Sequence, residues 1–116
     1  MSLFIYHNPR CSKSRETLTL LQQRGLEPEI IKYLDTPPDA EQLRVLLAQL
    51  GMSSARQLMR TKEEEYKTLG LAGVTDEDAL IAAMVANPKL IERPIVVCNG
   101  KAALGRPPEQ VLDILA

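Results

Sequence analysis

The residues best suited to chemistry form a short polar segment near the start of the chain, His7-Asn8-Pro9-Arg10-Cys11-Ser12-Lys13-Ser14-Arg15. Cys11 follows an expected strand and turn and immediately precedes an expected helix. The first N–H groups of a helix have no partner within the helix, and they stabilise an anion placed beside them. We therefore expect Cys11 to be held as a thiolate and to act as a nucleophile.

The helix end alone does not explain a thiolate at neutral pH. A free thiol has a pKa of roughly 8.5, and lowering that pKa by about two units takes roughly 2.7 kcal/mol. A helix N-terminus contributes about 0.3–1 kcal/mol, reaching ~2 kcal/mol in favourable geometry. Further help is expected from N–H groups of the turn, from the hydroxyl of Ser12 or Ser14, and from local cations. These cations are His7, Arg10, Lys13 and Arg15.

The sequence is compatible with two roles for His7. It could donate a proton or assist the thiolate, or it could be a turn residue bonded to the backbone. It is the only histidine in the chain, so no histidine metal cluster is expected.

Cys11 and Cys98 are the only two cysteines. Position 14 is a serine, so the segment lacks the second thiol of a dithiol redox protein, and a disulfide at Cys11 must be resolved by an external thiol. Position 17, where a phosphatase loop would carry an arginine six residues after its cysteine, is Thr17. Cys98 ends an apolar segment and is expected to be buried and inert.

Three arginines later in the chain are candidate anion ligands. Arg60 lies between expected helices, Arg93 precedes Pro94, and Arg106 precedes Pro107. A guanidinium fork matches a tetrahedral oxyanion, although a single arginine is most often a solvated surface residue. Their separation along the chain leaves open whether the three converge.

The surrounding pattern predicts an α/β protein. A strand over 2–6, a helix over 12–24 and a strand over 29–33 indicate a parallel βαβ unit. Helices are expected from Asp39 to Leu50, in one or two pieces over 53–69, and from Thr75 to Asn87. Asn99-Gly100 predicts a tight hairpin between strands over 94–98 and 101–104, and a last helix follows over 107–116. We expect a single domain of 116 residues with a helical insertion at about 37–90.

Composition limits the function classes. Hydrophobic residues make up 45% of the chain, which is enough for a core. The net charge of −1, from 14 basic and 15 acidic residues, argues against a nucleic-acid binder. No apolar stretch is long enough for a membrane span or a signal peptide. With so few cysteines, we expect a cytoplasmic protein.

The Cys11 segment closely resembles the start of the glutaredoxin-dependent arsenate reductases of the ArsC family. The similarity continues over essentially the whole chain, through Tyr33-Leu34, Arg60, Tyr66, Asn87-Pro88-Lys89-Leu90-Ile91-Glu92-Arg93-Pro94-Ile95-Val96 and Leu104-Gly105-Arg106-Pro107-Pro108-Glu109. The resemblance implies a thioredoxin-like (glutaredoxin-like) fold with a mixed four-stranded sheet, a helical insertion and a cis proline at Pro94.

The resemblance also implies roles for individual residues. Cys11 would be the nucleophile and His7 the residue that helps to lower its pKa. Arg60, Arg93 and Arg106 would bind arsenate, and we count Ser14 with them as a candidate substrate-binding residue. In the implied cycle the Cys11 thiolate attacks As(V), glutathione adds, arsenic is reduced to As(III), and glutaredoxin clears the mixed disulfide. Glutathione would be a co-substrate, with no bound cofactor or metal.

Other readings stay open from the sequence. The resemblance is to short members of the family, because plasmid-type members carry a longer C-terminal tail, so a related oxyanion is an alternative to arsenate. Spx-type regulators share this fold and bind RNA polymerase, but they usually carry a Cys-x-x-Cys switch, which Ser14 breaks. A general glutathione-linked thiol oxidoreductase would not need Arg60. A structural module with a relic site is the remaining alternative.

Overall fold

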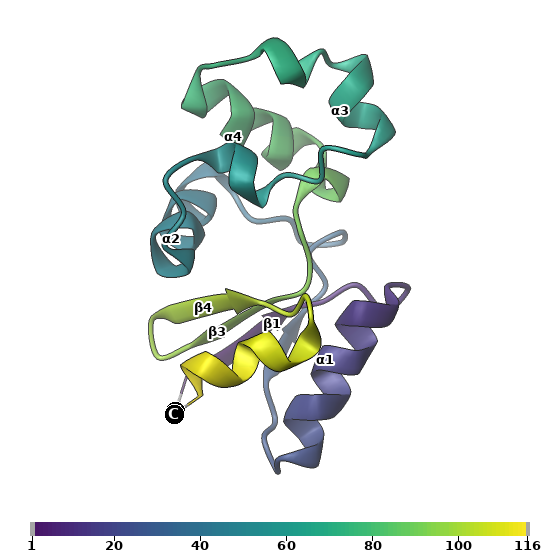
Figure 1. The fold of residues 1–116 in the computed structure, drawn as a ribbon, viewed down its shortest axis with the longest axis vertical. Coiled ribbons are helices and arrows are strands. Elements are labelled where there is room, and N and C mark those ends of the chain that lie inside the picture. The colour runs from purple at the N-terminus through teal and green to yellow at the C-terminus, as the bar shows by residue number, and fades with distance from the viewer. Residues whose placement is uncertain (1, 116) are drawn as a thin grey trace. The chain divides into compact units, whose positions relative to one another are not determined.

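Four short strands form one mixed sheet in the computed structural model, which describes residues 2–115 (Figure 1). The strands are β1 (Leu3–Tyr6), β2 (Glu29–Ile31), β3 (Ile95–Cys98) and β4 (Lys101–Leu104), in the order β2-β1-β3-β4. β1 is parallel to β2 and antiparallel to β3, which is antiparallel to β4. The predicted α/β class, the mixed four-stranded sheet of a thioredoxin-like fold and the parallel βαβ unit are confirmed.

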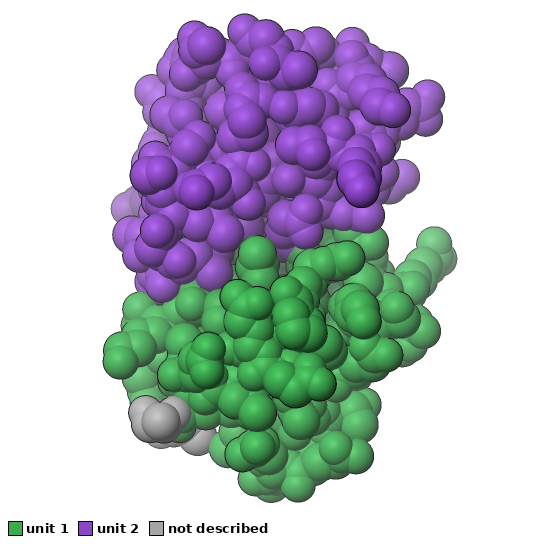
Figure 2. Space-filling model, in the orientation of Figure 1, with its two compact units in different colours: residues 1–36, 93–116 green, residues 37–92 purple. Residues whose placement is uncertain are grey.

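The chain divides into two compact units, coloured green and purple in Figure 2. The first unit combines Met1–Thr36 with Arg93–Ala116, and it contains the whole sheet. The second unit is Pro37–Glu92 and is mainly helical.

Two helices complete the first unit. α1 (Ser12–Gln23) and the short 3-10 helix η4 (Pro108–Ile114) contact each other, and η4 also packs on β4 (Figure 1). Leu21 of α1 is fully buried in the core of this unit, and burial of a leucine contributes about 1.5–3 kcal/mol. The other buried members of that core come mainly from the strands: Leu3, Ile5, Val96, Cys98, Ala103 and Val111.

Most local signals end the elements where the sequence predicts. Gly25 follows α1 with a φ of 76°, a left-handed conformation that glycine adopts without strain. Asn99 and Gly100 both have positive φ, 50° and 84°, as a type I′ hairpin turn requires. The strand expected over 29–33 is shorter because Lys32 begins a turn, in which its carbonyl accepts from the N–H groups of Asp35 and Thr36.

The last helix differs from the expected α-helix. η4 has 3-10 geometry and spans Pro108–Ile114, and the final predicted residue, 116, lies outside the described residues. A seven-residue helix that begins at a proline can form few i→i−4 hydrogen bonds, so the shorter i→i−3 pattern costs little.

The second unit begins with α2 (Ala40–Leu50), which starts at a capping box. Asp39 accepts from the Gln42 N–H at 2.8 Å, and the Gln42 side chain accepts from the Asp39 N–H at 3.0 Å. The helix ends at Gly51, as expected. The region 53–69 contains two pieces, η1 (Ala55–Leu58) and α3 (Glu64–Thr68). The elements η2 (Leu71–Gly73), α4 (Glu77–Ala86) and η3 (Pro88–Leu90) complete the unit.

Two charged side chains tie the helices of this unit together. The Glu77 carboxylate accepts from the Ala55 N–H at 2.7 Å and from the Ser54 hydroxyl at 2.9 Å, and these bonds lower the pKa of Glu77. The Arg56 guanidinium donates to the Tyr66 hydroxyl and to the carbonyl of Leu71. None of the helices within residues 2–115 has the length and hydropathy needed to cross a membrane.

Candidate active site

Cys11 lies at the N-terminus of α1, as predicted. It is the N-cap residue, with an extended backbone (φ −94°, ψ 124°), and its side chain is 9% exposed. The loop from β1 is closed by a hydrogen bond from the Cys11 N–H to the Asn8 carbonyl at 3.0 Å. The sulfur is therefore close to the unpaired N–H groups of the first helical turn.

Opposing influences act on the Cys11 thiol. Burial raises its pKa, but the backbone N–H of Ser14, the charge of Arg93, the N–H of Lys13 and a side-chain hydrogen bond from Arg93 together lower the pKa below its usual value. The thiol makes no capping hydrogen bond of standard geometry. The N–H groups of Lys13 and Ser14 thus act mainly on the thiolate, which a positive helix end favours.

Pairing of the strands brings Arg93 to Cys11. Tyr6, the last residue of β1, is opposite Ile95, the first residue of β3, so the segments beyond them lie at the same end of the sheet. Arg93 precedes Pro94 through a cis peptide bond, which confirms the expected cis proline.

The Arg93 side chain has unused hydrogen-bonding capacity. Its Nε and Nη1 atoms are buried and have no hydrogen-bond partner within residues 2–115. A buried donor without a partner costs roughly 1–3 kcal/mol, and more when it is charged. An oxyanion next to the Cys11 sulfur would satisfy both donors with the fork geometry that arginine supplies.

Arg106 lies at the same end of the sheet. It follows β4, whose last residue, Leu104, is opposite Ile95, and its Nη1 atom donates to the Arg93 carbonyl at 3.1 Å. The peptide bond from Arg106 to Pro107 is also cis, which the sequence did not predict. The first unit thus brings together three predicted site residues: Cys11, Arg93 and Arg106.

His7 and Ser14 form a buried pair behind the loop. Ser14 is fully buried, His7 is 6% exposed, and the Ser14 Oγ lies 2.6 Å from the His7 Nδ1. The same Oγ accepts from the Asn8 N–H at 3.0 Å. Burial, and then the charges of Lys32 and Arg15, lower the pKa of His7, so its ring is neutral at pH 7.

This arrangement differs in detail from the expected roles of His7 and Ser14. The Ser14 hydroxyl is engaged by His7 and Asn8, and it is the Ser14 backbone N–H that acts on the sulfur. His7 contacts Ser14, so the geometry gives it a part in holding the loop. The involvement of Ser14 and His7 with substrate stays a prediction.

Two of the expected local cations have other partners. The Arg15 Nη1 donates to the Pro9 carbonyl at 3.0 Å, and the Lys13 Nζ lies 3.6 Å from a Glu16 carboxylate oxygen. The cation that acts on the thiol is Arg93, which is far away in the sequence. The alignment of strand ends that brings it there depends on the register between β1 and β3, which no local pattern specifies.

Arg60 belongs to the second unit, Pro37–Glu92. Its guanidinium forms an ion pair with Glu63, and its backbone N–H donates to the Leu90 carbonyl at 2.7 Å. Its role as a third arsenate ligand stays a prediction.

Cys98 is buried on β3, opposite Leu3 at the start of β1, which fits the inert role predicted for it. Among the described residues, no group of three His, Cys, Asp or Glu side chains is arranged to hold a metal ion.

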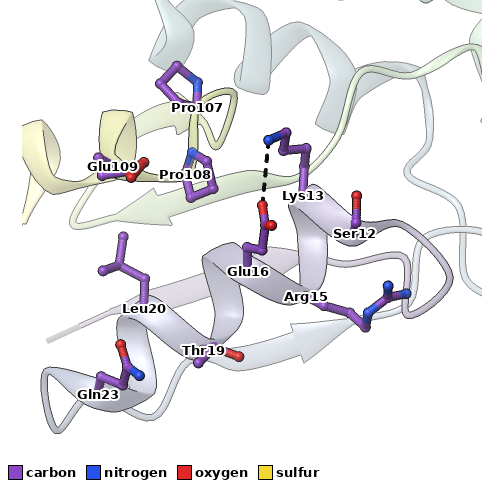
Figure 3. A pocket seen from close by; sticks show the side chains of 10 residues that line it. All are labelled: Ser12, Lys13, Arg15, Glu16, Thr19, Leu20, Gln23, Pro107, Pro108 and Glu109. Atoms are coloured by element: carbon purple, nitrogen blue, oxygen red, sulfur yellow. Dashed lines mark ion pairs between the residues drawn. The ribbon is translucent and has the colours of Figure 1, made fainter.

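A groove of about 620 Å³ lies between α1 and the start of η4, and Ser12, the residue after Cys11, is among those that line it (Figure 3). Ser12 and Lys13 line its end nearest the nucleophile, and Gln23 lines its far end. Glu16, paired with Lys13, and Glu109 give the groove carboxylates as well as cations. The groove can therefore contact both signs of charge on a ligand.

Comparison with known proteins identifies close relatives. The model of the ArsC family matches residues 6–114. The uncharacterized protein YfgD of Escherichia coli K12 is 68% identical, over 96% of this chain and 94% of its own. The arsenate reductase of Neisseria meningitidis serogroup A is 54% identical, over 96% of each chain. The solved structure of the arsenate reductase from Vibrio cholerae has a TM-score of 0.96 and 61% identity, covering 99% of this chain and 98% of that one.

Proposed function

The chain belongs to the ArsC family, and from this membership and the geometry of the site we propose that it is an arsenate reductase. The observation that carries the proposal is the juxtaposition of Cys11, whose pKa is lowered, with Arg93, which has two buried donors without a partner. A thiolate next to unpaired guanidinium donors suits attack on a tetrahedral oxyanion.

In the first step, the Cys11 Sγ attacks arsenic. An As–S bond forms, and one arsenate hydroxyl group takes up a proton and leaves as water. Arg93 and Arg106 balance the negative charge of the remaining oxygens, and the N–H groups of Lys13 and Ser14 hold the sulfur as an anion before attack. We include Arg60 as a third ligand because it matches the corresponding family arginine.

The reducing electrons come from two thiols. A glutathione thiol replaces a second arsenic-bound hydroxyl, which leaves as water, and a disulfide then forms between the Cys11 and glutathione sulfurs as both As–S bonds break. Its formation delivers two electrons, which reduce As(V) to As(III). A glutaredoxin thiolate attacks the mixed disulfide and releases Cys11. We propose a cytoplasmic location because this cycle needs a reduced glutathione pool.

The groove beside Cys11 is the proposed approach for glutathione. Glutathione carries two carboxylates and an ammonium group. Lys13 and Arg15 line the groove as partners for the carboxylates, and Glu16 and Glu109 as partners for the ammonium. This charge pattern supports a small zwitterionic thiol as the second substrate.

A coupled assay tests the proposed function. NADPH oxidation is followed with arsenate, glutathione, glutaredoxin and glutathione reductase, and each of the first three is then omitted in turn. We expect the rate to fall to background in every omission. Turnover when a glutathione mixed disulfide replaces arsenate as the oxidant would indicate a general thiol oxidoreductase. No turnover with the complete mixture would contradict the proposal.

A further inference from the structure

Thr17 is six residues after Cys11, at the position where a phosphatase loop would carry its arginine. In this protein the Thr17 side chain is fully buried and faces a different segment. Its Oγ1 donates to the Lys13 carbonyl at 2.8 Å and lies 3.5 Å from the carbonyl oxygen of Gly105. Thr17 therefore contacts the residue that immediately precedes Arg106.

There is no space for a side chain at position 105. A Cβ atom on Gly105 would lie 2.4 Å from the Thr17 Oγ1, 3.0 Å from the Thr17 Cγ2 and 2.7 Å from the Pro94 Cγ. The Gly105 N–H also donates to the Pro94 carbonyl at 3.0 Å. The backbone at Gly105 is thus in direct contact with α1, through Thr17, and with Pro94, the residue after Arg93.

This contact connects the nucleophile to its guanidinium groups. Thr17 and Cys11 are joined rigidly by about 9 Å of helix, given a rise of about 1.5 Å per residue. On the other side, Gly105 is bonded to Arg106, whose guanidinium donates to the Arg93 carbonyl. A change in the distance between α1 and this backbone would therefore move the Arg106 segment relative to Cys11.

We propose that Thr17 and Gly105 are positioning residues, whose close packing sets Arg106 and Arg93 at the right distance from the Cys11 thiolate. A phosphatase loop would have an arginine at position 17. Here the smaller, buried Thr17 occupies that position, and the arginines, Arg93 and Arg106, come from segments that are distant in the sequence. The inference rests on the proposed function, since it concerns binding of the same oxyanion.

Gly105→Ala is the direct test. The added methyl group must displace α1, the Arg106 segment or Pro94 next to Arg93, and a misplacement of about 1 Å at such a site can lower the rate on the order of 100-fold. We expect kcat/KM for arsenate to fall by roughly 10- to 100-fold, mainly through a higher KM for arsenate. Gly73→Ala is the matched control, because a Cβ there meets nothing within 4 Å and the backbone has no positive φ.

A second variant distinguishes positioning from a loss of folding. Thr17→Ala removes two of the three atoms that crowd position 105. Combined with Gly105→Ala, it should restore part of the lost kcat/KM, because the contact with Pro94 remains; a simple sum of two defects would lower kcat/KM further. Unchanged arsenate kinetics in Gly105→Ala, or a double variant that is no better than Gly105→Ala, would overturn the proposal.

Arsenate binding can also be measured without turnover. The quantity is the arsenate concentration that halves the rate at which iodoacetamide alkylates Cys11. We expect this concentration to rise in Gly105→Ala and to return toward the wild-type value in the double variant. Equal protection in wild type and Gly105→Ala would overturn the positioning role. If wild type binds arsenate but does not turn it over, the proposed function fails while this comparison still decides the role of the contact.

Discussion

At the scale of single residues, the site depends on a buried thiol whose pKa is lowered. Burial alone would keep Cys11 protonated and unreactive. The N–H groups of Ser14 and Lys13 and the side chain of Arg93 reverse that effect. Arg93 is also the component with spare hydrogen-bonding capacity, because two of its donors remain unpartnered within residues 2–115.

Arg93→Ala should raise the pKa of Cys11. The variant loses both a positive charge and a hydrogen bond that favour the thiolate, so the sulfur should become reactive only at higher pH. The measurement is the rate of iodoacetamide alkylation as a function of pH. Arg24→Ala, at an exposed arginine of the same unit, is the control. A midpoint that does not move in Arg93→Ala would show that Arg93 does not stabilise the thiolate.

His7 should make the protein sensitive to mild acid. Its folded-state pKa is below the usual 6.5, so the unfolded chain takes up a proton that the folded chain does not. The free energy of unfolding should therefore fall as the pH drops below about 6.5. In His7→Asn an amide can still bond to Ser14 but does not titrate, so urea unfolding should depend less on pH between about pH 7 and 5.5. The same pH dependence in both proteins would contradict a neutral buried His7.

Local sequence identifies the nucleophile but not its surroundings. Cys11 could be predicted because a strand, a turn and a helix start all have local signals. The expected help from Arg10, Lys13 and Arg15 followed from proximity in sequence, yet Arg15 bonds to a carbonyl and Lys13 to a glutamate. The effective cation, Arg93, is adjacent only after the strands pair, and family resemblance was the signal that selected it.

At the scale of elements, short-range chemistry set most boundaries. Asn99-Gly100 turns the hairpin, and Asp39 and Gly51 bound α2. These features were predictable because each rests on a residue type that a particular backbone conformation requires. The strand order β2-β1-β3-β4 depends on tertiary packing. The early end of β2 and the 3-10 geometry of η4 differ from the prediction, and they follow from the turn at Lys32 and from the short, proline-led last helix.

Asp39→Ala should weaken the helical unit. The variant removes a capping box, and loss of an N-cap side chain costs about 0.5–2 kcal/mol. Urea unfolding should report a decrease of this size in the free energy of unfolding. Asp35→Ala is the control, because it removes the same charge from an exposed turn that caps no helix. Equal stability of the two variants would argue against the cap.

At the scale of the whole molecule, the fold separates the two cysteines. Cys98 pairs with Leu3 at the start of β1, whereas the loop to Cys11 follows Tyr6 at the end of that strand. The strand alone separates Leu3 from Tyr6 by about 10 Å, and a disulfide needs Cα atoms within about 7 Å. We therefore expect that Cys98 cannot resolve a disulfide formed at Cys11 in the folded protein.

Mild oxidation with oxidised glutathione should modify Cys11 alone. We expect intact-mass measurement to detect one added glutathione, and peptide mapping to place it on Cys11 with Cys98 still free. Reduced glutaredoxin should remove it. A disulfide between Cys11 and Cys98 in the native protein would contradict the separation of the two thiols.

The central claim is that the Cys11 thiolate attacks arsenate, and production of arsenite by Cys11→Ser and Cys98→Ser variants tests it most directly. Each variant replaces one buried sulfur by oxygen, so the pair controls for the substitution itself. With glutathione and glutaredoxin present, we expect arsenite from wild type and Cys98→Ser and none above background from Cys11→Ser. Arsenite formed by Cys11→Ser at the wild-type rate would contradict the account.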